Sequence, residues 1–451
     1  MTIRHALVPA YLAACLLLGG ASAAGFAANM VLQLAALPII CVALWSLIFA
    51  PPPNLNRAPL IFFGICLVFM ALQLLPLPPE LWTALPGRAP VADGLRLLQV
   101  PLPWLPLSLD PAGTLASLLW LLPAIATLLG VVVLGAFRGS LLSWSLLVVT
   151  VLSIAVGALQ LAGGKVGGAY IYEITNYGVA VGFFANGNHM ATLLLVAIPF
   201  LGALQLSLLR RARSPRNASA VRVLTATIFV VLIVGLLTNL SLAGLGLSVP
   251  VVLVSFLSFR RKDIKPRWWI FAVALLLSVA AVATVVLGPF GNNLVGSQQH
   301  NAELSRRTSF QLTLNAAREY LPFGSGVGTF QEVYRTQEPL KSVTTVYMNH
   351  AHSDWLELLL ETGLLGIGLA AIFLLWWAAR VRAIWTATGP DYYARAAAIA
   401  TGTILLHSLV DYPLRTAAIS AVFAMCAGLM SDARPFTRRQ AASASTRHVT
   451  I

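Results

Sequence analysis

The feature that most constrains this chain is a series of apolar runs, each about 20 residues long, that recurs along its whole length. An α-helix of that length crosses the hydrocarbon core of a bilayer. Of the 451 residues, 58% are hydrophobic and only 10% are charged, whereas soluble proteins carry about 25% charge. The sequence therefore predicts an all-α polytopic membrane protein. No polar stretch is long enough for a separate soluble core, so we expect residues 1–451 to form one integral membrane domain.

The apolar runs predict about twelve transmembrane helices. Their expected ranges are 6–25, 29–50, 58–79, 113–135, 140–162, 188–209, 220–239, 241–258, 268–288, 355–378, 393–411 and 415–431. Three longer connecting segments then lie on one side of the membrane, at 80–112, 163–187 and 289–354. The longest of them is expected between the ninth and tenth helices.

The basic residues indicate the orientation of these helices. With the N-terminus in the cytoplasm, the cytoplasmic segments contain 20 of the 29 lysines and arginines but only three of the 15 acidic residues. This asymmetry follows the positive-inside rule, so it explains the net charge of +14 without a nucleic-acid partner. We expect both termini in the cytoplasm and the three longer segments on the outer, periplasmic face, where no ATP is available.

The N-terminal run has two interpretations. Residues 1–25 resemble a signal peptide, because Ala21-Ser22-Ala23 has the spacing of a cleavage site. The alternative is an uncleaved first helix, which we favour because Arg4 is a weak charged start. Both interpretations leave the orientation of the remaining chain unchanged.

The segment 289–354 leads into MNHAHSDWLELLLETGLLG (348–366), which brings titratable side chains to the start of a membrane helix. Asp354 and Glu357 have the spacing of an N-cap and an N3 residue, and Glu361 shares their face of the helix. A carboxylate one or two turns into a membrane helix is costly unless it is paired. Interfacial capping therefore explains the first two acids well and Glu361 poorly.

Two histidines stand immediately before this helix. His352, beside carboxylates and with a pKa near neutrality, is suited to act as a general base or to orient a hydroxyl. His350-Ala-His352 is also a weak zinc-binding pattern, but no HExxH motif follows it. We therefore expect no metal ion at this site.

An amphipathic helix is predicted upstream, in the 289–354 segment. Its polar face consists of Arg307, Gln311, Asn315 and Arg318, and its apolar face of Phe310, Leu314, Ala317 and Leu321. Such a helix is suited to the membrane surface, either as an anchor or with its arginines on phosphate oxygens. The following LPFGSGVG (321–328) lacks the GK[ST] ending of a nucleotide loop and predicts a tight turn.

Two further outer motifs contain polar residues. FFANGNHMA (183–191) includes Asn188 and His189, and it follows a tyrosine-rich segment typical of a membrane interface or of stacking on sugar rings. HSLVDYPLR (407–415) spans the short turn between the last two helices, where Asp411 and Arg415 are spaced to form a local pair.

These blocks together resemble the bacterial O-antigen ligase and O-antigen polymerase superfamily. The blocks are FFANGNHMA, the region 306–330, HAHSDWLELLLETGLLG (350–366) and HSLVDYPLR, and the resemblance is strongest over residues 180–432. It implies a fold like that of C-type glycosyltransferases. It also implies metal-independent transfer of a glycan from undecaprenyl diphosphate to an acceptor hydroxyl, with no cofactor.

The resemblance also implies roles for individual residues. The family's essential histidine lies in an H-N-x-x-L context, which His352 matches with Ser353 in place of Asn. Its periplasmic arginine is similar to Arg306 or Arg307, and its C-terminal aspartate is similar to Asp411. On this basis the two arginines would hold the donor diphosphate.

One departure from the family pattern concerns phosphate binding. The family often carries an S-R-x-G block, and here Leu242 follows Ser241 where the arginine would stand. Arg318 or Arg415 is then expected to supply the missing contact to the donor diphosphate.

The expected division of labour makes His352 the base or orienting group. Glu361 or Asp354 would set its tautomer and charge, and Asp411 would brace the arginines. The residues expected to support this centre are His350, Asn188 and His189.

The expected protein is thus a multi-pass glycosyltransferase of the bacterial inner membrane, acting on the periplasmic face. The first interpretation is an O-antigen ligase whose acceptor is lipid A–core. An alternative is a polymerase that extends a growing polysaccharide of O-antigen, capsule or exopolysaccharide repeat units. A lipid-glycan transporter is a third interpretation. Transporters tend to show internal repeats and midplane charges, whereas the charges here gather on the outer face.

Overall fold

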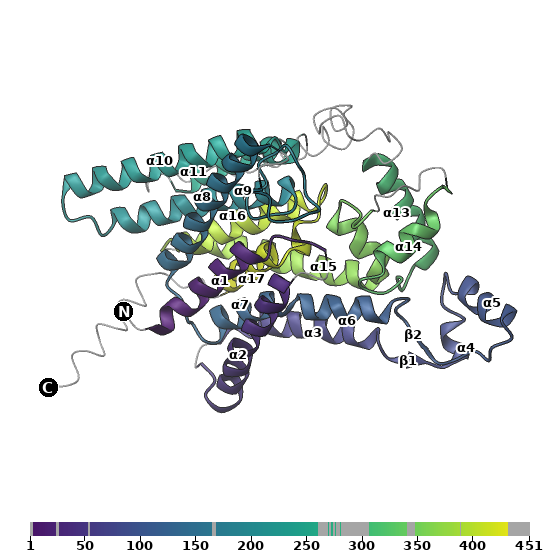
Figure 1. The fold of residues 1–451 in the computed structure, drawn as a ribbon. Helices are drawn as coiled ribbons and strands as arrows, with labels where there is room; N and C mark the ends of the chain where they lie inside the picture. The colour runs from purple at the N-terminus through teal and green to yellow at the C-terminus, as the bar shows by residue number, and fades with distance from the viewer. Residues whose placement is uncertain are drawn as a thin grey trace.

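The computed structural model describes residues 3–23, 27–52, 55–164, 168–259, 306–340, 348–387 and 389–431, with five isolated helical residues between 269 and 280. This part of the chain is mostly helical, and most of its long helices run in roughly the same direction (Figure 1).

The described helices lie at the positions that the apolar runs predict. Those of ten residues or more are α1 (Leu7–Leu18), α2 (Ala27–Phe49), α3 (Ala58–Leu72), α6 (Pro111–Trp120), α7 (Leu122–Val132), α8 (Gly139–Gly163), α9 (Gly187–Leu209), α10 (Pro215–Asn239), α11 (Leu242–Ser258), α13 (Arg306–Tyr320), α15 (Asp354–Thr386), α16 (Tyr392–His407) and α17 (Ala417–Ser431). Shorter elements are η1 (Ile3–Ala6), α4 (Pro79–Trp82), α5 (Ala89–Leu97), α14 (Phe330–Gln337) and η5 (Pro413–Arg415).

Six spans in the described residues are long and apolar enough to cross a membrane. They are α2, the stretch Pro111–Val132 that contains α6 and α7, α8, α9, α10 and α15. The all-α membrane fold is thereby supported. The expected helix 268–288 lies almost entirely outside the described residues, so the count of twelve and the loop after it remain predictions.

Two helices end earlier than the apolar pattern predicts. α1 ends at Leu18 instead of residue 25, and the chain continues without helical structure. α3 ends at Leu72 instead of residue 79, where the chain turns into β1 (Pro76–Leu77), which pairs antiparallel with β2 (Leu105–Pro106). Apolar composition shows that a segment is shielded from water, but it does not locate the residue at which a helix ends.

The main core lies around α9, which packs against α8, α10, α11 and α16. Of the 18-residue apolar stretch of α9, 72% is buried inside the protein, whereas the corresponding share is 22% for α2 and for α10. α9 is therefore a central helix, whereas α2 and α10 expose most of their apolar surface. Small buried residues on α16, including Ala396, Ala397 and Ala400, let neighbouring helices approach closely.

A second, smaller core joins α13 and α14 to the first turns of α15. Its buried members include Ala316, Tyr320, Phe330 and Leu360. The expected polar face of α13 is exposed at Gln311, Asn315 and Arg318. On the opposite face Ala317 is buried, whereas Phe310, Leu314 and Leu321 are half-buried. The position of α13 at the membrane surface therefore remains a prediction.

The segment between α3 and α6 lies at the same end of the molecule as α13 and α14 (Figure 1). Arg88 lies over the ring of Tyr320, 5.7 Å from its centroid, and donates to the carbonyl oxygen of Leu107. Two of the expected outer segments, 80–112 and 289–354, are therefore in direct contact.

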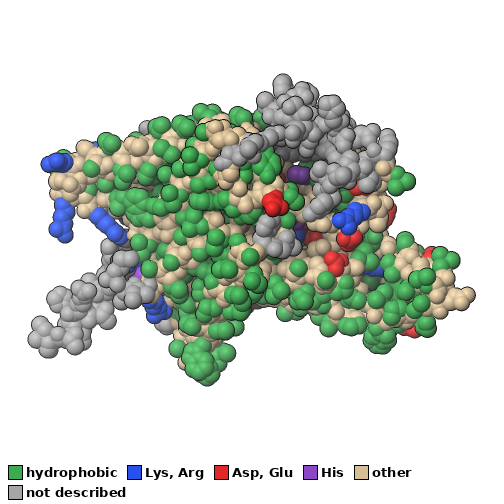
Figure 2. All heavy atoms as spheres, in the orientation of Figure 1, with side chains coloured by type: hydrophobic (Ala, Val, Ile, Leu, Met, Phe, Trp, Pro, Cys, Tyr) green, Lys and Arg blue, Asp and Glu red, His purple; other side chains and the backbone are tan. Residues whose placement is uncertain are grey.

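Charged side chains separate along the molecule. Figure 2 shows several Lys and Arg at the end where α9 leads into α10, whereas the visible Asp and Glu lie away from that end, together with a further Lys or Arg. This separation follows the expected distribution between the two membrane faces. Which face is cytoplasmic remains a prediction.

Candidate functional site

The candidate site is built on a break in α15. Gly363 has φ 59° and ψ −150° inside this helix, which divides it into a short segment that begins at Asp354 and a long one. A side chain at Gly363 would collide with the carbonyl oxygen of Pro322. That oxygen accepts a hydrogen bond from the amide of Leu364, at 2.9 Å. The predicted glycine turn at 321–328 therefore packs into the break.

The same turn holds the short segment of α15 in place. The amide of Ser325 donates to the carbonyl oxygen of Leu360 at 3.0 Å. The amide of Gly328 donates to Oε1 of Glu361 at 2.9 Å. From the other side, the Thr114 hydroxyl donates to the carbonyl of Val327. The close backbone approach that the glycines allow is thus used between two parts of the protein.

Three carboxylates of the short segment converge on Arg415. Its Nη2 lies 3.0 Å from Oε2 of Glu361 and 3.4 Å from Oε1 of Glu357, and its Nε lies 3.7 Å from Oδ1 of Asp354. The side chains of Glu357 and Glu361 are each only 1% exposed. Burial opposes the charge of Arg415, but the three carboxylates outweigh burial and raise its pKa above the usual range.

The carboxylates of this cluster have further donors. Oε2 of Glu357 accepts from the amide of Ala351 at 3.0 Å, and Oδ2 of Asp354 accepts from the Ser408 hydroxyl at 2.7 Å. Buried charges are tolerated when they are paired and hydrogen-bonded. We call Arg415 with Asp354, Glu357 and Glu361 the Arg415 cluster.

His350 is attached to the Arg415 cluster. Its Nδ1 lies 2.8 Å from Oε1 of Glu357, and its Nε2 lies 3.2 Å from the main-chain oxygen of Ser22. A carboxylate and a carbonyl both accept hydrogen bonds, so both ring nitrogens act as donors and the imidazole is cationic. Burial lowers the pKa of His350, but the contacts with Glu357 outweigh it, and the pKa is raised above its ordinary value.

Asp411 lies in a different kind of environment. Its side chain is fully buried, and neither carboxylate oxygen has a hydrogen-bond partner among the described residues. Nε2 of His189 is 3.6 Å from one oxygen, and Nδ1 of His352 is 3.8 Å from the other. Both distances exceed those of hydrogen bonds. A buried carboxylate without close donors is costly, so the two imidazoles are groups among the described residues that offset the charge of Asp411.

His352 is the most accessible histidine of this region. Its side chain is 29% exposed, against 13% for His350 and none for His189. Its φ of 53° places it in the left-handed region, which is uncommon for residues other than glycine and recurs at functional sites. Because Nδ1 faces Asp411, Nε2 is the nitrogen left for a reacting group. We call Asp411, His352 and His189 the Asp411 cluster.

Tyr412 links the two clusters, and the sequence analysis did not single it out. Its ring centroid lies 4.6 Å from that of His350, 4.9 Å from that of His189 and 5.2 Å from that of His352. Burial raises the pKa of Tyr412, so its hydroxyl stays neutral. Its position directly after Asp411 in HSLVDYPLR was the available signal.

The expected supporting residue Asn188 lies at the start of α9. Its side-chain oxygen accepts from the hydroxyl of Ser241 at 2.7 Å, which ties α9 to the N-terminus of α11. Ser241 itself caps α11 by accepting from the amide of Gly244. Ser241 therefore links α9 to α11. It directly precedes Leu242, which stands where the family's arginine would be.

The arginines expected to bind phosphate are only partly described. Arg306 and Arg307 form the start of α13, and their side chains lie outside the described residues. Arg318 is exposed, with Nη1 3.4 Å from Oδ1 of Asn315. The predicted phosphate contacts of all three remain predictions.

Two expected pairings are exchanged in the structure. The sequence analysis placed Glu361 or Asp354 beside His352, and Asp411 beside the arginines. Instead Asp411 lies beside His352, whereas Glu361 and Asp354 lie beside Arg415. Helical spacing puts the carboxylates of α15 on one face, but it does not show which residue of the 407–415 turn meets them.

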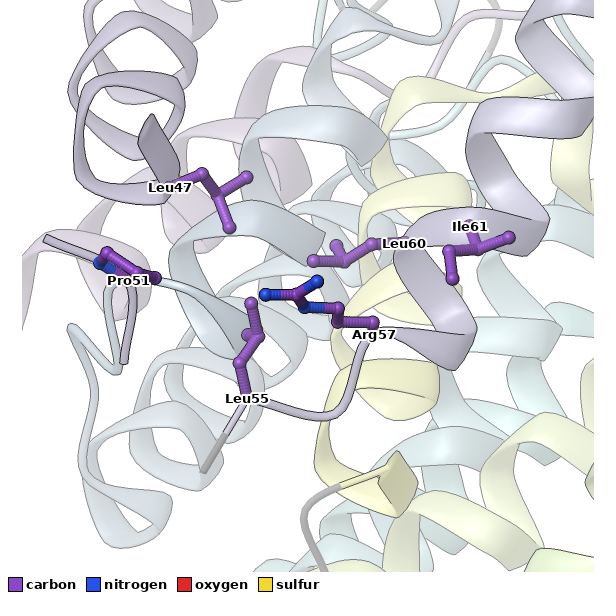
Figure 3. A pocket seen from close by; sticks show the side chains of 6 residues that line it. All are labelled: Leu47, Pro51, Leu55, Arg57, Leu60 and Ile61. Carbon is purple, nitrogen blue, oxygen red and sulfur yellow. The ribbon is translucent and has the colours of Figure 1, made fainter. Parts of the chain in front are cut away.

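The described residues form no metal centre at this site, and the pocket of Figure 3 lies elsewhere. In the described ranges, no group of three or more His, Cys, Asp and Glu side chains has a geometry that could hold a metal ion. A pocket of about 330 Å³ lies between the end of α2 and the start of α3, lined by Leu47, Pro51, Leu55, Arg57, Leu60 and Ile61 (Figure 3). It contains one ionisable group and lies away from both clusters.

Comparison with known proteins identifies one family. Residues 224–371 match the family model described as O-antigen ligase. The match covers about a third of the chain and includes α11, α13, α14, both site histidines before α15 and the carboxylates of its short segment. It confirms the resemblance drawn from the sequence. No curated protein matches the chain significantly.

Proposed function

From this O-antigen ligase region, we propose that the chain is a membrane glycosyltransferase that uses a glycan linked to undecaprenyl diphosphate. The acceptor is a hydroxyl group at the periplasmic face of the inner membrane, and lipid A–core is the acceptor we favour. The observation that carries the proposal is the position of His352, which combines a buried carboxylate on one nitrogen with the largest exposure among the site histidines.

The proposed reaction exchanges one bond at the anomeric carbon of the donor sugar. The bond from that carbon to the diphosphate oxygen breaks, and a bond to the acceptor oxygen forms. The acceptor proton passes to Nε2 of His352, and the diphosphate leaves with the electron pair of the broken bond. The activated donor supplies the driving force, so no ATP site is required.

Asp411 is proposed to orient His352. A carboxylate beside Nδ1 favours the tautomer with hydrogen on that nitrogen, and it stabilises the imidazolium that forms when Nε2 takes up a proton. The distance of 3.8 Å between Nδ1 and Oδ1 is longer than a hydrogen bond. Catalytic hydrogen bonds are often long without substrate and shorten in the reacting complex.

Arg415 is proposed to brace the site instead of binding the donor. Three carboxylates surround its guanidinium, so its donor groups are already engaged within the protein. Arg306, Arg307 and Arg318 on α13 remain the proposed diphosphate-binding residues. Each of the three arginines is replaced singly by Gln. Substitution of the arginine that binds the diphosphate should raise the KM for the lipid-linked donor.

The experiment that tests the proposal compares three strains of the native host. The gene is deleted, and the deletion is complemented with wild type or with His352→Ala. Loss of long-chain lipopolysaccharide with accumulation of long undecaprenyl-linked glycan, restored by wild type only, supports the ligase. Restoration by His352→Ala would contradict the mechanism.

A polymerase is the second candidate, because the matched family also accommodates it and Leu242 departs from the S-R-x-G block. In that case the deletion leaves lipid A–core capped normally, and a secreted polymer disappears or shrinks to single repeat units. Ligase and polymerase are thus separated by the same three strains.

The break at Gly363 is a specific observation that bears on the transporter alternative, because transporters use broken helices at their substrate sites. Here, however, the acidic groups before the break are paired with Arg415. Purified protein in detergent distinguishes the two classes, since a transferase forms product without a membrane barrier and a transporter does not.

A further inference from the structure

The N-terminal chain beyond α1 lies against the candidate site. Residues 19–23 continue from the end of α1 without helical structure, and Gly19, Gly20 and Ala21 are buried. We call residues 19–23 the strap. This stretch contains the Ala21-Ser22-Ala23 pattern that resembles a cleavage site.

The strap makes main-chain hydrogen bonds to three separate parts of the site region. The amide of Ala418, at the start of α17, donates to the carbonyl of Gly19 at 3.0 Å. The amide of Ala185, just before α9, donates to the carbonyl of Gly20 at 3.2 Å. Nε2 of His350 lies 3.2 Å from the carbonyl oxygen of Ser22. The carbonyls of Gly19, Gly20 and Ser22 therefore join α17, the approach to α9 and His350.

Side chains add to these contacts. The Ser22 side chain lies near the hydroxyl of Tyr412, whose ring contacts the three histidines. Tyr172 bonds to the main chain of Gly20 and Ala21. A side chain at Gly20 would collide with the carbonyl of Phe183, a main-chain atom that cannot turn away. The main chain at position 20 of the strap therefore lies too close to Phe183 for any residue larger than glycine.

We propose that the strap is a positioning element of the proposed active site, which requires that the N-terminal segment stays attached to the mature protein. Its Ser22 carbonyl holds the second nitrogen of His350 while Glu357 holds the first. Cleavage after Ala23 would release this carbonyl together with α1, whose Leu12, Cys15 and Leu16 are fully buried. The catalytic part of this inference rests on the proposed function, whereas retention of the segment does not.

The first test is the intact mass of the full chain purified from the membrane fraction, with an epitope tag before Met1. We expect the mass of the uncleaved chain and the tag on the protein. A mature chain that begins at residue 24 would overturn the inference, whatever its activity.

The second test compares Gly20→Ala with Gly64→Ala in the transferase assay. Gly64 lies in α3 with no atom near the added Cβ, so Gly64→Ala should retain wild-type activity. Gly20→Ala should lose roughly tenfold or more in rate, the scale of one hydrogen bond to a charged group. Equal activity of the two folded variants would overturn the positioning role.

The third test remains decisive if Gly20→Ala does not fold. Ser22→Ala removes the hydroxyl that contacts Tyr412, and Ser22→Thr keeps it. We expect a few-fold loss of rate in the first, rescue in the second, and an unchanged Tm in both. A full rate in Ser22→Ala would contradict the role of this contact. An inactive wild type with an intact N-terminus would instead count against the proposed function.

Discussion

Asp411 and Arg415 lie four residues apart in one turn, and their surroundings are opposite. Arg415 meets three carboxylates, each with further hydrogen-bond donors. Asp411 is buried with two histidines at 3.6 and 3.8 Å and with no hydrogen bond on either oxygen among the described residues. In the described part of the chain, every carboxylate of the Arg415 cluster accepts at least one hydrogen bond, although Oδ1 of Asp354 accepts none, whereas in the Asp411 cluster neither carboxylate oxygen accepts one.

The difference separates structural from chemical roles. A buried network of ion pairs and hydrogen bonds rigidifies the elements that supply it, here the short segment of α15 and the turn after α16. Asp411 has only two longer histidine contacts and lies beside an accessible histidine, which fits its proposed role in orienting His352. Substitutions in the Arg415 cluster should therefore act mainly on stability, and those in the Asp411 cluster mainly on rate.

The largest effect on rate is expected at His352. Loss of a general base lowers a rate by about 100- to 10,000-fold, and His352→Ala should do so without lowering the Tm in detergent, because the ring is partly exposed. The rate of product formation with saturating donor and acceptor measures this. His5→Ala, a histidine outside the site, serves as the control. A comparable loss of rate in His352→Ala and His5→Ala would contradict a specific role of His352 in the reaction.

The largest effect on stability is expected at Arg415. Arg415→Gln leaves three carboxylates without their cation, and breaking a buried ion pair costs about 3–5 kcal/mol. The Tm should fall strongly, and detergent-solubilised protein should aggregate at lower temperature. Arg335→Gln is the matched control, because its pair with Glu332 at 3.1 Å is exposed and contributes about 1 kcal/mol or less. Similar Tm values for the two would show that the Arg415 cluster is no brace.

Asp411→Asn should give the opposite combination. Loss of the charge beside His352 is expected to lower the rate by about ten- to a hundredfold. The Tm should fall much less than in Arg415→Gln, since the two histidine contacts of the replaced carboxylate are longer than hydrogen bonds. Asp93→Asn, at an exposed pair with Arg96, is the control for both readouts. A large fall in Tm would place Asp411 among the structural groups.

The smallest effect is a pH dependence at the border between the clusters. The pKa of His350 is raised in the folded protein, so its contribution to stability is complete below the unfolded value of about 6.5 and is lost as pH rises through the folded value. The Tm difference between wild type and His350→Gln should be largest below the unfolded value of about 6.5 and should shrink as pH rises through the folded pKa. A difference that grows with pH would contradict a cationic His350.

Much of the fold could be predicted because burial in a membrane is a property of composition. Runs of apolar residues located α2, α8, α9, α10 and α15 to within a few residues at most ends. The early ends of α1 and α3 could not be predicted in this way. The chain leaves the helix there because of contacts made with distant residues, such as that between Gly19 and Ala418.

The sequence predicted most of the residues of the candidate site, but it did not predict which of them are in contact. Spacing alone put Asp354, Glu357 and Glu361 on one helix face, and motif reading found the 407–415 turn. Tyr412 and Ser22 were not assigned to the site. Tyr412 is marked only by its place in HSLVDYPLR, and Ser22 only by the pattern that resembles a cleavage site. Neither pattern predicts a contact with the histidines.

What the sequence by itself determined is the class of the protein: a helical membrane chain with two histidines and three acids around the start of α15, because apolar length and charge placement are local properties. Only the tertiary structure decided which acid lies beside which histidine or arginine. The strap (19–23), the glycine turn (321–328) and the 407–415 turn are far apart in the sequence, and their groups meet through packing that no local pattern encodes. The exchange of Asp411 and Glu361 between His352 and Arg415 follows from that packing.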